Sequence, residues 1–236
     1  MSDELLRVDG LCAGYGASQV LDELTFSMAQ EAVTIVGRNG MGKTTLCNTL
    51  MGLTSPTSGS ITFAGQRIDG LTPEKIARRG IAYIPQGRRL FPSLTVDEHL
   101  AMLAKGTKGK RWTPEAVYEL FPRLAQRRKN GGAELSGGEQ QMLSVGRALL
   151  LNAQLYLMDE PSEGLAPTIV DDLIKAVHHL IELGSAVLIV EQNLRAATSM
   201  AERQLIMVSG RIEHETTAAQ LRDDPALQKQ YLGVDA

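Results

Sequence analysis

The sequence predicts an α/β fold whose core is a mainly parallel sheet, with an antiparallel β region near the N-terminus and a helical region inserted in the middle. The run Val33-Thr34-Ile35-Val36 favours a strand, and it leads through a glycine-rich turn into a helical pattern. Apolar runs at 155–158 and 185–190 are typical of strands buried on both faces. Between about 87 and 150, helical patterns alternate with polar breaks. These three observations predict the fold class.

The length of 236 residues suits one large domain spanning 1–236, or a core with a smaller subdomain. The net charge of -3 gives no argument for nucleic acid as a partner. No apolar run is long enough to cross a bilayer, so we expect a soluble chain whose membrane role, if it has one, comes through a partner. Cys12 and Cys47 have no metal-like spacing and fit a reducing compartment, and we expect Cys47 to pack in the core.

The sequence pattern of residues about 1–30 and about 60–70 predicts a small antiparallel β subdomain. Short alternating strands are expected over 5–28, interrupted by the turn at 14–16, and a loop is expected over 54–59. Tyr15 lies in that turn. Its ring is either a structural aromatic or a surface on which an adenine stacks, and position alone favours neither.

The turn after Val36 has the spacing of a phosphate-binding loop: glycine, four residues, glycine, lysine, then serine or threonine. Glycines let the backbone amides face inward, and the following helix adds its own free amides and dipole. Lys43 is placed to reach the β and γ phosphates, and the Thr44 hydroxyl to bind magnesium. The alternative is a glycine-rich turn without a ligand. The nucleotide-binding residues predicted here are Gly37, Arg38, Asn39, Gly40, Met41, Gly42, Lys43, Thr44 and Thr45.

Gln86 follows the predicted strand 81–84 and Pro85 on a loop. A glutamine at such a place can contact a metal or a water, although it is more often a solvated loop residue. Helices are predicted over 96–103 and 114–124. The basic runs 105–111 and 127–129 have no interleaved aromatics, so we interpret them as solvated surface.

Ser136 and Glu139 have the spacing of a capping box at a helix start. An ordinary cap does not need two glycines in the first turn, where each costs up to about 1 kcal/mol relative to alanine. Gly137 and Gly138 therefore suggest that an anion approaches the amides closely.

Asp159 and Glu160 follow the buried strand 155–158, at the end of a sheet where open α/β proteins bind ligands. Side chains alternate along a strand, so we expect Asp159 to contact magnesium and Glu160 to face an attacking water. The alternative is an ordinary helix cap before Pro161.

The C-terminal third predicts a helix over 167–183 and a late hairpin from 205–208 and 211–215, followed by a polar helical tail. Gln192 follows the strand 185–190. The four histidines have no partner at metal-ligand spacing and are interpreted as structural or surface residues: His99, His178, His179 and His214.

Taken together, these motifs resemble those of the ATP-binding cassette (ABC) ATPases, a P-loop NTPase family, over essentially the whole chain. The resemblance rests on the phosphate loop, on Gln86 as the Q-loop, on Leu135-Ser136-Gly137-Gly138-Glu139 and on Asp159-Glu160, in the family's order. It implies ATP and Mg²⁺ as cofactors, with Thr44, Gln86 and Asp159 at the metal. It also implies Glu160 as the general base and Tyr15 as the adenine-stacking ring.

The resemblance further implies a head-to-tail dimer, either a homodimer or a heterodimer with a second ABC ATPase. Each ATP would lie between the phosphate loop of one subunit and Ser136, Gly137 and Gly138 of the other. Two integral-membrane permeases and a periplasmic or extracellular substrate-binding protein would complete an importer. The chain would then lie at the cytoplasmic face of the inner membrane as a peripheral subunit.

The run 159–167 and Val190-Glu191-Gln192-Asn193 look most like the second (LivF-type) ATPase subunit of branched-chain amino-acid importers. ATPases of urea and short-chain amide importers are closely similar, so that substrate class stays open, and a soluble ABC ATPase without a transport role is a further alternative. Gln192 stands where most family members have a histidine, and Ala166 where many have an aspartate. A glutamine amide donates but carries no charge, so we expect Gln192 to position the phosphate while Glu160 accepts the proton.

Overall fold

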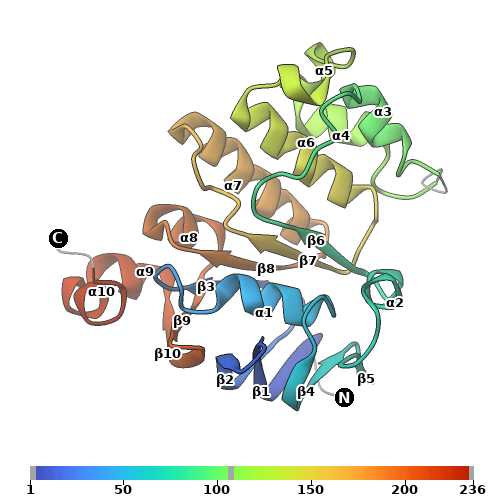
Figure 1. Cartoon of the computed structure of the whole chain (residues 1–236). Helices are drawn as coiled ribbons and strands as arrows, with labels where there is room; N and C mark the ends of the chain where they lie inside the picture. The colour runs from blue at the N-terminus through green and yellow to red at the C-terminus, as the bar shows by residue number, and fades with distance from the viewer. Residues whose placement is uncertain (1–3, 106–108, 234–236) are drawn as a thin grey trace.

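The computed structural model describes residues 4–105 and 109–233, and two sheets organise them (Figure 1). One is antiparallel, in the order β2-β1-β4-β5, and the other is mainly parallel, in the order β10-β9-β3-β8-β7-β6. Together with the helices that cover them, they confirm the predicted fold class. The strands are β1 Leu6–Tyr15, β2 Ser18–Met28, β3 Ala32–Val36, β4 Pro56–Phe63, β5 Gln66–Arg67, β6 Ile81–Ile84, β7 Leu155–Asp159, β8 Ala186–Glu191, β9 Arg203–Val208 and β10 Arg211–Thr217.

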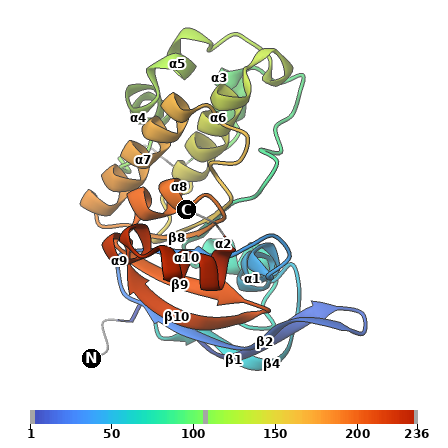
Figure 2. The same ribbon diagram turned by 90° about the vertical axis from the view of Figure 1, so that its left-hand side faces the viewer.

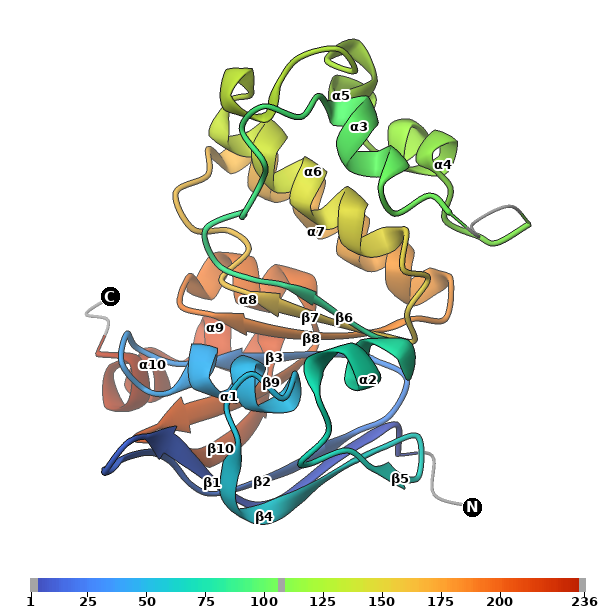
Figure 3. The ribbon, with the colours of Figure 1, turned by 45° about the vertical axis from the view of Figure 1, so that its right-hand side comes forward.

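Helices cover both faces of the central sheet (Figure 3). They are α1 Lys43–Leu50, α2 Pro73–Arg78, α3 Val96–Ala101, α4 Pro114–Leu120, α5 Pro122–Gln126, α6 Gly137–Leu149, α7 Pro167–Glu182, α8 Leu194–Met200, α9 Ala218–Asp223 and α10 Pro225–Leu232, with a short 3₁₀ turn at Gly132–Glu134. Helix α1 lies between the two sheets, and α6 and α7 lie on the opposite face of the central sheet. Figure 2 shows α8, α9 and α10 together at the C-terminal side of the molecule.

The register of the parallel strands places the residues that follow β3, β7 and β8 at the same end of the central sheet. Val36 of β3 pairs with Glu191 of β8, and Asp159 of β7 pairs with Val190 of β8. The phosphate loop, Glu160 and Gln192 each follow one of these strand ends. Because the strands are parallel, all three leave the sheet at the same edge.

The antiparallel sheet differs from expectation in strand length. β1 and β2 form one long hairpin that continues through Gly14 and Tyr15, where short interrupted strands were expected. The segment 54–59, predicted as a loop, contains the first part of β4, so that prediction was wrong from Pro56 onward. Proline is compatible with the first residue of a strand, and Gly59 adopts φ 86 where β4 and β1 shift register.

The helix predicted over 114–124 is two helices. Pro122 cannot continue the hydrogen-bonding of α4, so the chain turns at Phe121 (φ -123, ψ 77) and begins α5. The late hairpin forms as β9 and β10, and its first strand joins the central sheet beside β3. Of the basic run 105–111, residues 106–108 lie outside the described part. Among the described residues, no helix is both long and apolar enough to span a membrane.

Candidate active site

A hollow of about 420 Å³ lies at the carboxyl edge of the central sheet, over the start of α1. Most of the predicted phosphate-loop residues line it. Gln86, which follows β6, and Glu160, which follows β7, line it as well. The lining residues are Val20, Asn39, Gly40, Gly42, Lys43, Thr44, Thr45, Gln86, Glu160 and Glu163.

The loop's geometry depends on its glycines. Gly40 and Gly42 have φ of 81° and 104°, in the left-handed region that side chains disfavour. A Cβ on Gly37 would lie 2.7 Å from the Met207 carbonyl oxygen of β9. Helix α1 starts at Gly42 without a side-chain cap and without an acidic residue in its first turn. No side chain of the helix start therefore competes with a ligand for its first amides or for the positive end of its dipole.

Lys43 is almost fully buried, and its ammonium is held by three oxygens. It donates to the carbonyls of Gly37 (2.8 Å) and Arg38 (3.0 Å), and its Nζ lies 3.0 Å from Glu160 Oε1. The two carbonyls bend the ammonium back over the loop. A buried ammonium at this point attracts phosphate oxygens strongly.

Asp159 is buried beneath the hollow, and two hydroxyls donate to it. Thr44 Oγ1 donates to Oδ1 at 3.2 Å and Tyr83 Oη to Oδ2 at 3.0 Å. Burial raises the pKa of Asp159, while the hydrogen bonds from Tyr83 and Thr44 oppose that rise. A buried carboxylate beside a threonine hydroxyl is an oxygen donor set of the kind that Mg²⁺ prefers, so these residues fit the predicted metal.

Gln86 and Glu160 meet over the hollow. Gln86 Nε2 donates to Glu163 Oε2 at 2.8 Å and contacts Glu160 Oε2 at 3.4 Å. Glu160 has φ 46, which a residue with a side chain adopts only when its surroundings impose it. This backbone turn sends the Glu160 carboxylate to Lys43, whereas Asp159 points down to Thr44.

Tyr15, at the end of β1, is about half exposed. Hydrogen bonding with Asn48, Thr45 and Thr54 lowers the pKa of its hydroxyl, which places the ring beside α1. The ring therefore lies next to α1 with much of its surface in solvent. Its position is compatible with stacking on a base, and Val20 of β2 lies closer to the hollow itself.

Gln192 lines a different hollow, of about 380 Å³, on the other side of the loop. Its backbone is positioned by Glu191, a buried carboxylate that sequence reasoning did not single out. Glu191 accepts from the amides of Ser162 (2.9 Å), Gln192 (3.0 Å) and Asn193 (3.1 Å). Burial raises the pKa of Glu191, although these amides oppose the rise. One side chain thus ties the segment after Glu160 to the segment that carries Gln192.

The turn that starts α6 has the predicted capping box. Ser136 Oγ accepts from the Glu139 amide, and the Glu139 carboxylate accepts from the Ser136 amide. The structure also gives the glycines a reason within the chain. A Cβ on Gly138 would lie 2.7 Å from Ile169 of α7, and one on Gly137 would lie 3.0 Å from the Arg88 guanidinium. Close packing therefore accounts for Gly138 without a ligand, which weakens the sequence argument for an anion.

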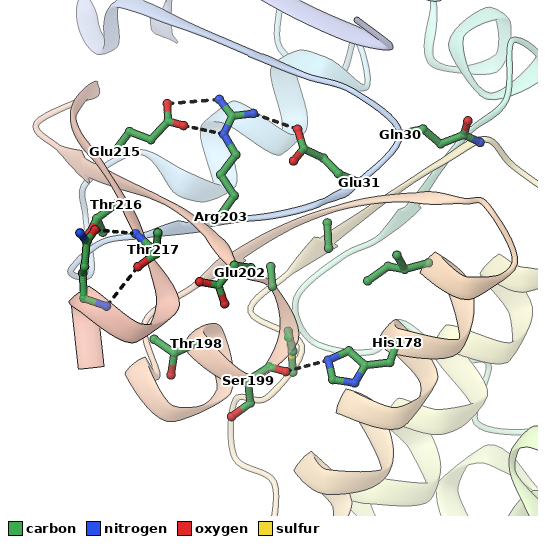
Figure 4. A pocket seen from close by; sticks show the side chains of 15 residues that line it. Gln30, Glu31, His178, Thr198, Ser199, Glu202, Arg203, Glu215, Thr216 and Thr217 are labelled. Carbon is green, nitrogen blue, oxygen red and sulfur yellow. Dashed lines mark hydrogen bonds and ion pairs between the residues drawn. The ribbon is translucent and has the colours of Figure 1, made fainter. Parts of the chain in front are cut away.

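A larger hollow, of about 830 Å³, lies at the opposite edge of the sheet, where β3 and β9 begin (Figure 4). Two of its polar side chains already have partners: Arg203 is paired with Glu31 and Glu215, and His178 is bonded to the Ser199 carbonyl. Parallel sheets bind ligands at the other edge. We therefore place the active site at the smaller hollow over α1.

The structure brings Lys43, Thr44, Gln86, Asp159 and Glu160 together, whereas Ser136, Gly137 and Gly138 start a separate helix. Sequence reasoning missed Tyr83, Glu163 and Glu191. Of these, Glu191 had a recognisable signal, since it ends a buried strand at the ligand-binding edge. Tyr83 lies within β6 as a strand residue and had none. Cys47 is fully buried, as predicted.

Comparison with known proteins finds a matching family model, similar curated relatives and similar solved structures. Residues 21–163 match the ABC transporter family. The high-affinity branched-chain amino acid transport ATP-binding protein BraG of Pseudomonas aeruginosa is 40% identical over 97% of this chain and 100% of its own. The probable branched-chain amino acid transport ATP-binding protein LivF of Archaeoglobus fulgidus is 32% identical over 98% and 99%. A solved nucleotide-free ATP-binding cassette from an ABC transporter superposes with TM-score 0.83 at 25% identity, over 99% of this chain and 100% of that chain.

Proposed function

The chain belongs to the ABC transporter family of ATP-binding proteins, and on that premise we propose that it is the ATP-hydrolysing subunit of an importer for branched-chain amino acids. The observation that carries the hydrolytic role is the meeting of Lys43, Thr44, Asp159 and Glu160 over the free start of α1. The substrate class follows from the similarity to BraG and LivF, both named for branched-chain amino acid transport.

In this proposal the amides from Gly37 to Thr45 bind the phosphates of ATP, and the Tyr15 ring stacks on the adenine. Thr44 and Asp159 would hold Mg²⁺, with Gln86 of the same hollow as a further ligand. The metal, when bound, neutralises charge on the β and γ phosphate oxygens. Lys43 then exchanges Glu160 for a phosphate oxygen, because both acceptors compete for one ammonium.

Once Lys43 has turned to phosphate, the Glu160 carboxylate is free to accept a proton from the attacking water. Gln86 Nε2 lies 3.4 Å from Glu160 Oε2 and orients this carboxylate. Gln192 donates its amide to the γ phosphate and carries no charge there. The roles of Glu160 and Gln192 are thus unequal, with proton transfer assigned to the first alone.

The second half of the ATP site is supplied by another subunit in this proposal. Ser136, Gly137 and Gly138 lie at a helix start that is separate from the phosphate loop of the same chain. A head-to-tail dimer, with itself or with a second ABC ATPase, would bring this start to the γ phosphate of the partner's ATP.

We propose that a permease docks at a hollow of about 360 Å³ between the central sheet and the helical region of about 87–150. It is lined by Tyr83, Pro85, Arg88, Arg89, Leu103, Ser144, Arg147, Ala148 and Leu151. Tyr83 contacts Asp159, and Pro85 precedes Gln86, so movement at the nucleotide can reach this surface. Two permeases and a substrate-binding protein would complete the importer, with this chain at the cytoplasmic face of the inner membrane.

The proposal is tested by purifying the complete complex with its permeases and binding protein in lipid vesicles. We expect ATP hydrolysis that increases when leucine, isoleucine or valine is supplied with the binding protein, and that is lost in Glu160→Gln. Stimulation by urea or a short-chain amide instead would assign the other substrate class. Hydrolysis that no permease stimulates would contradict the importer role.

A further inference from the structure

The C-terminal helix α10 packs beside both segments that the proposed function brings to the γ phosphate. A small apolar cluster joins Leu232 of α10 to Val36, the last residue of β3, and to Leu194 and Ala197 of α8. Val36 directly precedes the phosphate loop, and α8 begins two residues after Gln192. One cluster therefore supports the phosphate loop and the Gln192 segment together.

The end of α10 also reaches the active-site edge. Leu232 and Gly233 line the 380 Å³ hollow with Gly37, Arg38, Asn39 and Gln192. Gly233 closes the helix with φ 64, and a Cβ there would lie 3.2 Å from the Arg38 guanidinium. The negative end of a helix dipole beside a guanidinium is favourable. Figures 1 and 3 show α10 next to the loop between β3 and α1.

Helix α10 is anchored at its other end. Asp224 caps it by accepting from the amides of Ala226 and Leu227. Gln228 is buried, and its side chain donates to the carbonyls of Leu221 and Arg222 at the end of α9. These bonds place Leu232 at a defined point of the cluster.

We infer that α10 is a brace that sets the distance between the phosphate loop and Gln192, with Leu232 and Gly233 as positioning residues for ATP hydrolysis. The inference rests on the proposed function. Lys43 and Gln192 must meet the same phosphate, and a misplacement of about 1 Å can cost about 10²-fold in rate. A cavity at Leu232 would let the two segments move apart without removing either group.

The test compares two leucine deletions in the same cluster, measured in the full chain as kcat and KM for ATP. Leu232 and Leu221 are both buried, at 8% and 0% exposure, but only Leu232 lines the hollow. We expect Leu232→Ala to lower kcat about 10-fold with KM changed less than about 2-fold. Leu221→Ala loses as much packing and should leave kcat per folded molecule within about 2-fold. Leu232→Met should restore most of the lost kcat.

The brace acts through Gln192, so Leu232→Ala should cost much less kcat in a Gln192→Ala background than in the wild type. The inference is wrong if Leu232→Ala and Leu221→Ala lower kcat equally. It is also wrong if the losses of kcat from Leu232→Ala and Gln192→Ala add in full in the double variant, because the helix then supports the fold alone. Should Leu232→Ala not fold, Gly233→Ala, which strains the helix end beside Arg38, makes the same comparison with an expected loss of about 3-fold. Absence of hydrolysis in the wild type would overturn the proposed function instead, which keeps the two failures distinct.

Discussion

The starts of α1 and α6 are both helix N-termini with glycines at the turn, yet they are built differently. Helix α1 has no side-chain cap, so its amides and those of the loop remain available to a ligand. Helix α6 caps itself with Ser136 and Glu139, and Glu139 also places a negative charge in its first turn. Only α1 has a buried lysine at its start. An uncapped start beside a buried lysine suits α1 to phosphate binding, whereas the capped start of α6 has only a few amides to offer.

The largest effect is expected at the α1 side, from Glu160→Gln. The amide cannot accept the proton of the attacking water, so kcat should fall about 10²–10³-fold. ATP affinity should stay equal or increase, because Lys43 no longer has a carboxylate at 3.0 Å. Single-turnover hydrolysis and equilibrium nucleotide binding measure the two effects. Glu74→Gln, in an exposed ion pair with Arg78, is the matched control. Near-normal turnover in Glu160→Gln would show that Glu160 is not the general base.

A second substitution tests the α6 side. Gly138→Ala would bring a Cβ to 2.7 Å from Ile169, so we expect a loss of about 1–3 kcal/mol in the free energy of unfolding. Nucleotide binding to α1 in the monomer should not change, whereas ATP-dependent dimer formation should weaken. Urea unfolding and light scattering with ATP measure these effects.

The double variant Gly138→Ala with Ile169→Ala relieves the clash and separates the two roles of the glycine. If dimer formation returns with stability, the glycine serves packing alone. If stability returns and dimer formation does not, the glycine amide needs close access to its ligand.

A smaller effect is expected at Gln192. Removing one positioning donor in Gln192→Ala should lower kcat by about 10-fold, since a hydrogen bond from an amide to a charged phosphate contributes about 1.5 kcal/mol. Gln192→His, which keeps a donor, should retain more activity. Steady-state kinetics of both variants beside Glu160→Gln checks the order of the losses. A complete loss in Gln192→Ala would reverse the assigned roles.

The smallest effect is a pH dependence on the α6 side. His99 is buried, its Nε2 accepts from the Phe91 amide and its Nδ1 contacts the Thr95 carbonyl, so it is neutral. Burial lowers the pKa of His99, and Arg147 lowers it further, while Thr95, Glu98 and Leu94 oppose this.

The unfolded chain therefore binds more protons than the folded one between the lowered pKa and the ordinary value. The free energy of unfolding should fall as pH drops below about 6.5 through this window. Urea unfolding at a series of pH values checks the slope, which should flatten in His99→Gln. An unchanged slope in that variant would assign the pH dependence to other groups.

The sequence predicted the local structure of the segments that form the candidate site. A strand, a glycine turn and a helix with Lys43 and Thr44 form one continuous segment, so their spacing determines their geometry. The same holds for Asp159 and Glu160 at a strand end and for the Ser136–Glu139 capping box, which involves residues three apart. The resemblance to a family followed from these segments, and the match over 21–163 confirms it.

Other features appear only when distant segments meet. Tyr83 donates to Asp159, Glu191 accepts from Ser162, and Gly138 packs under Ile169. The first part of β4 contains Pro56 and Gly59, which are typical of a loop. Pairing with β1 makes this segment a strand. Local sequence patterns set dihedral preferences and apolar faces, whereas these contacts depend on strand register and helix packing. The sequence by itself thus predicted which residues bind ATP, and the tertiary structure decided what holds them in place, from Tyr83 beneath Asp159 to α10 beside Arg38.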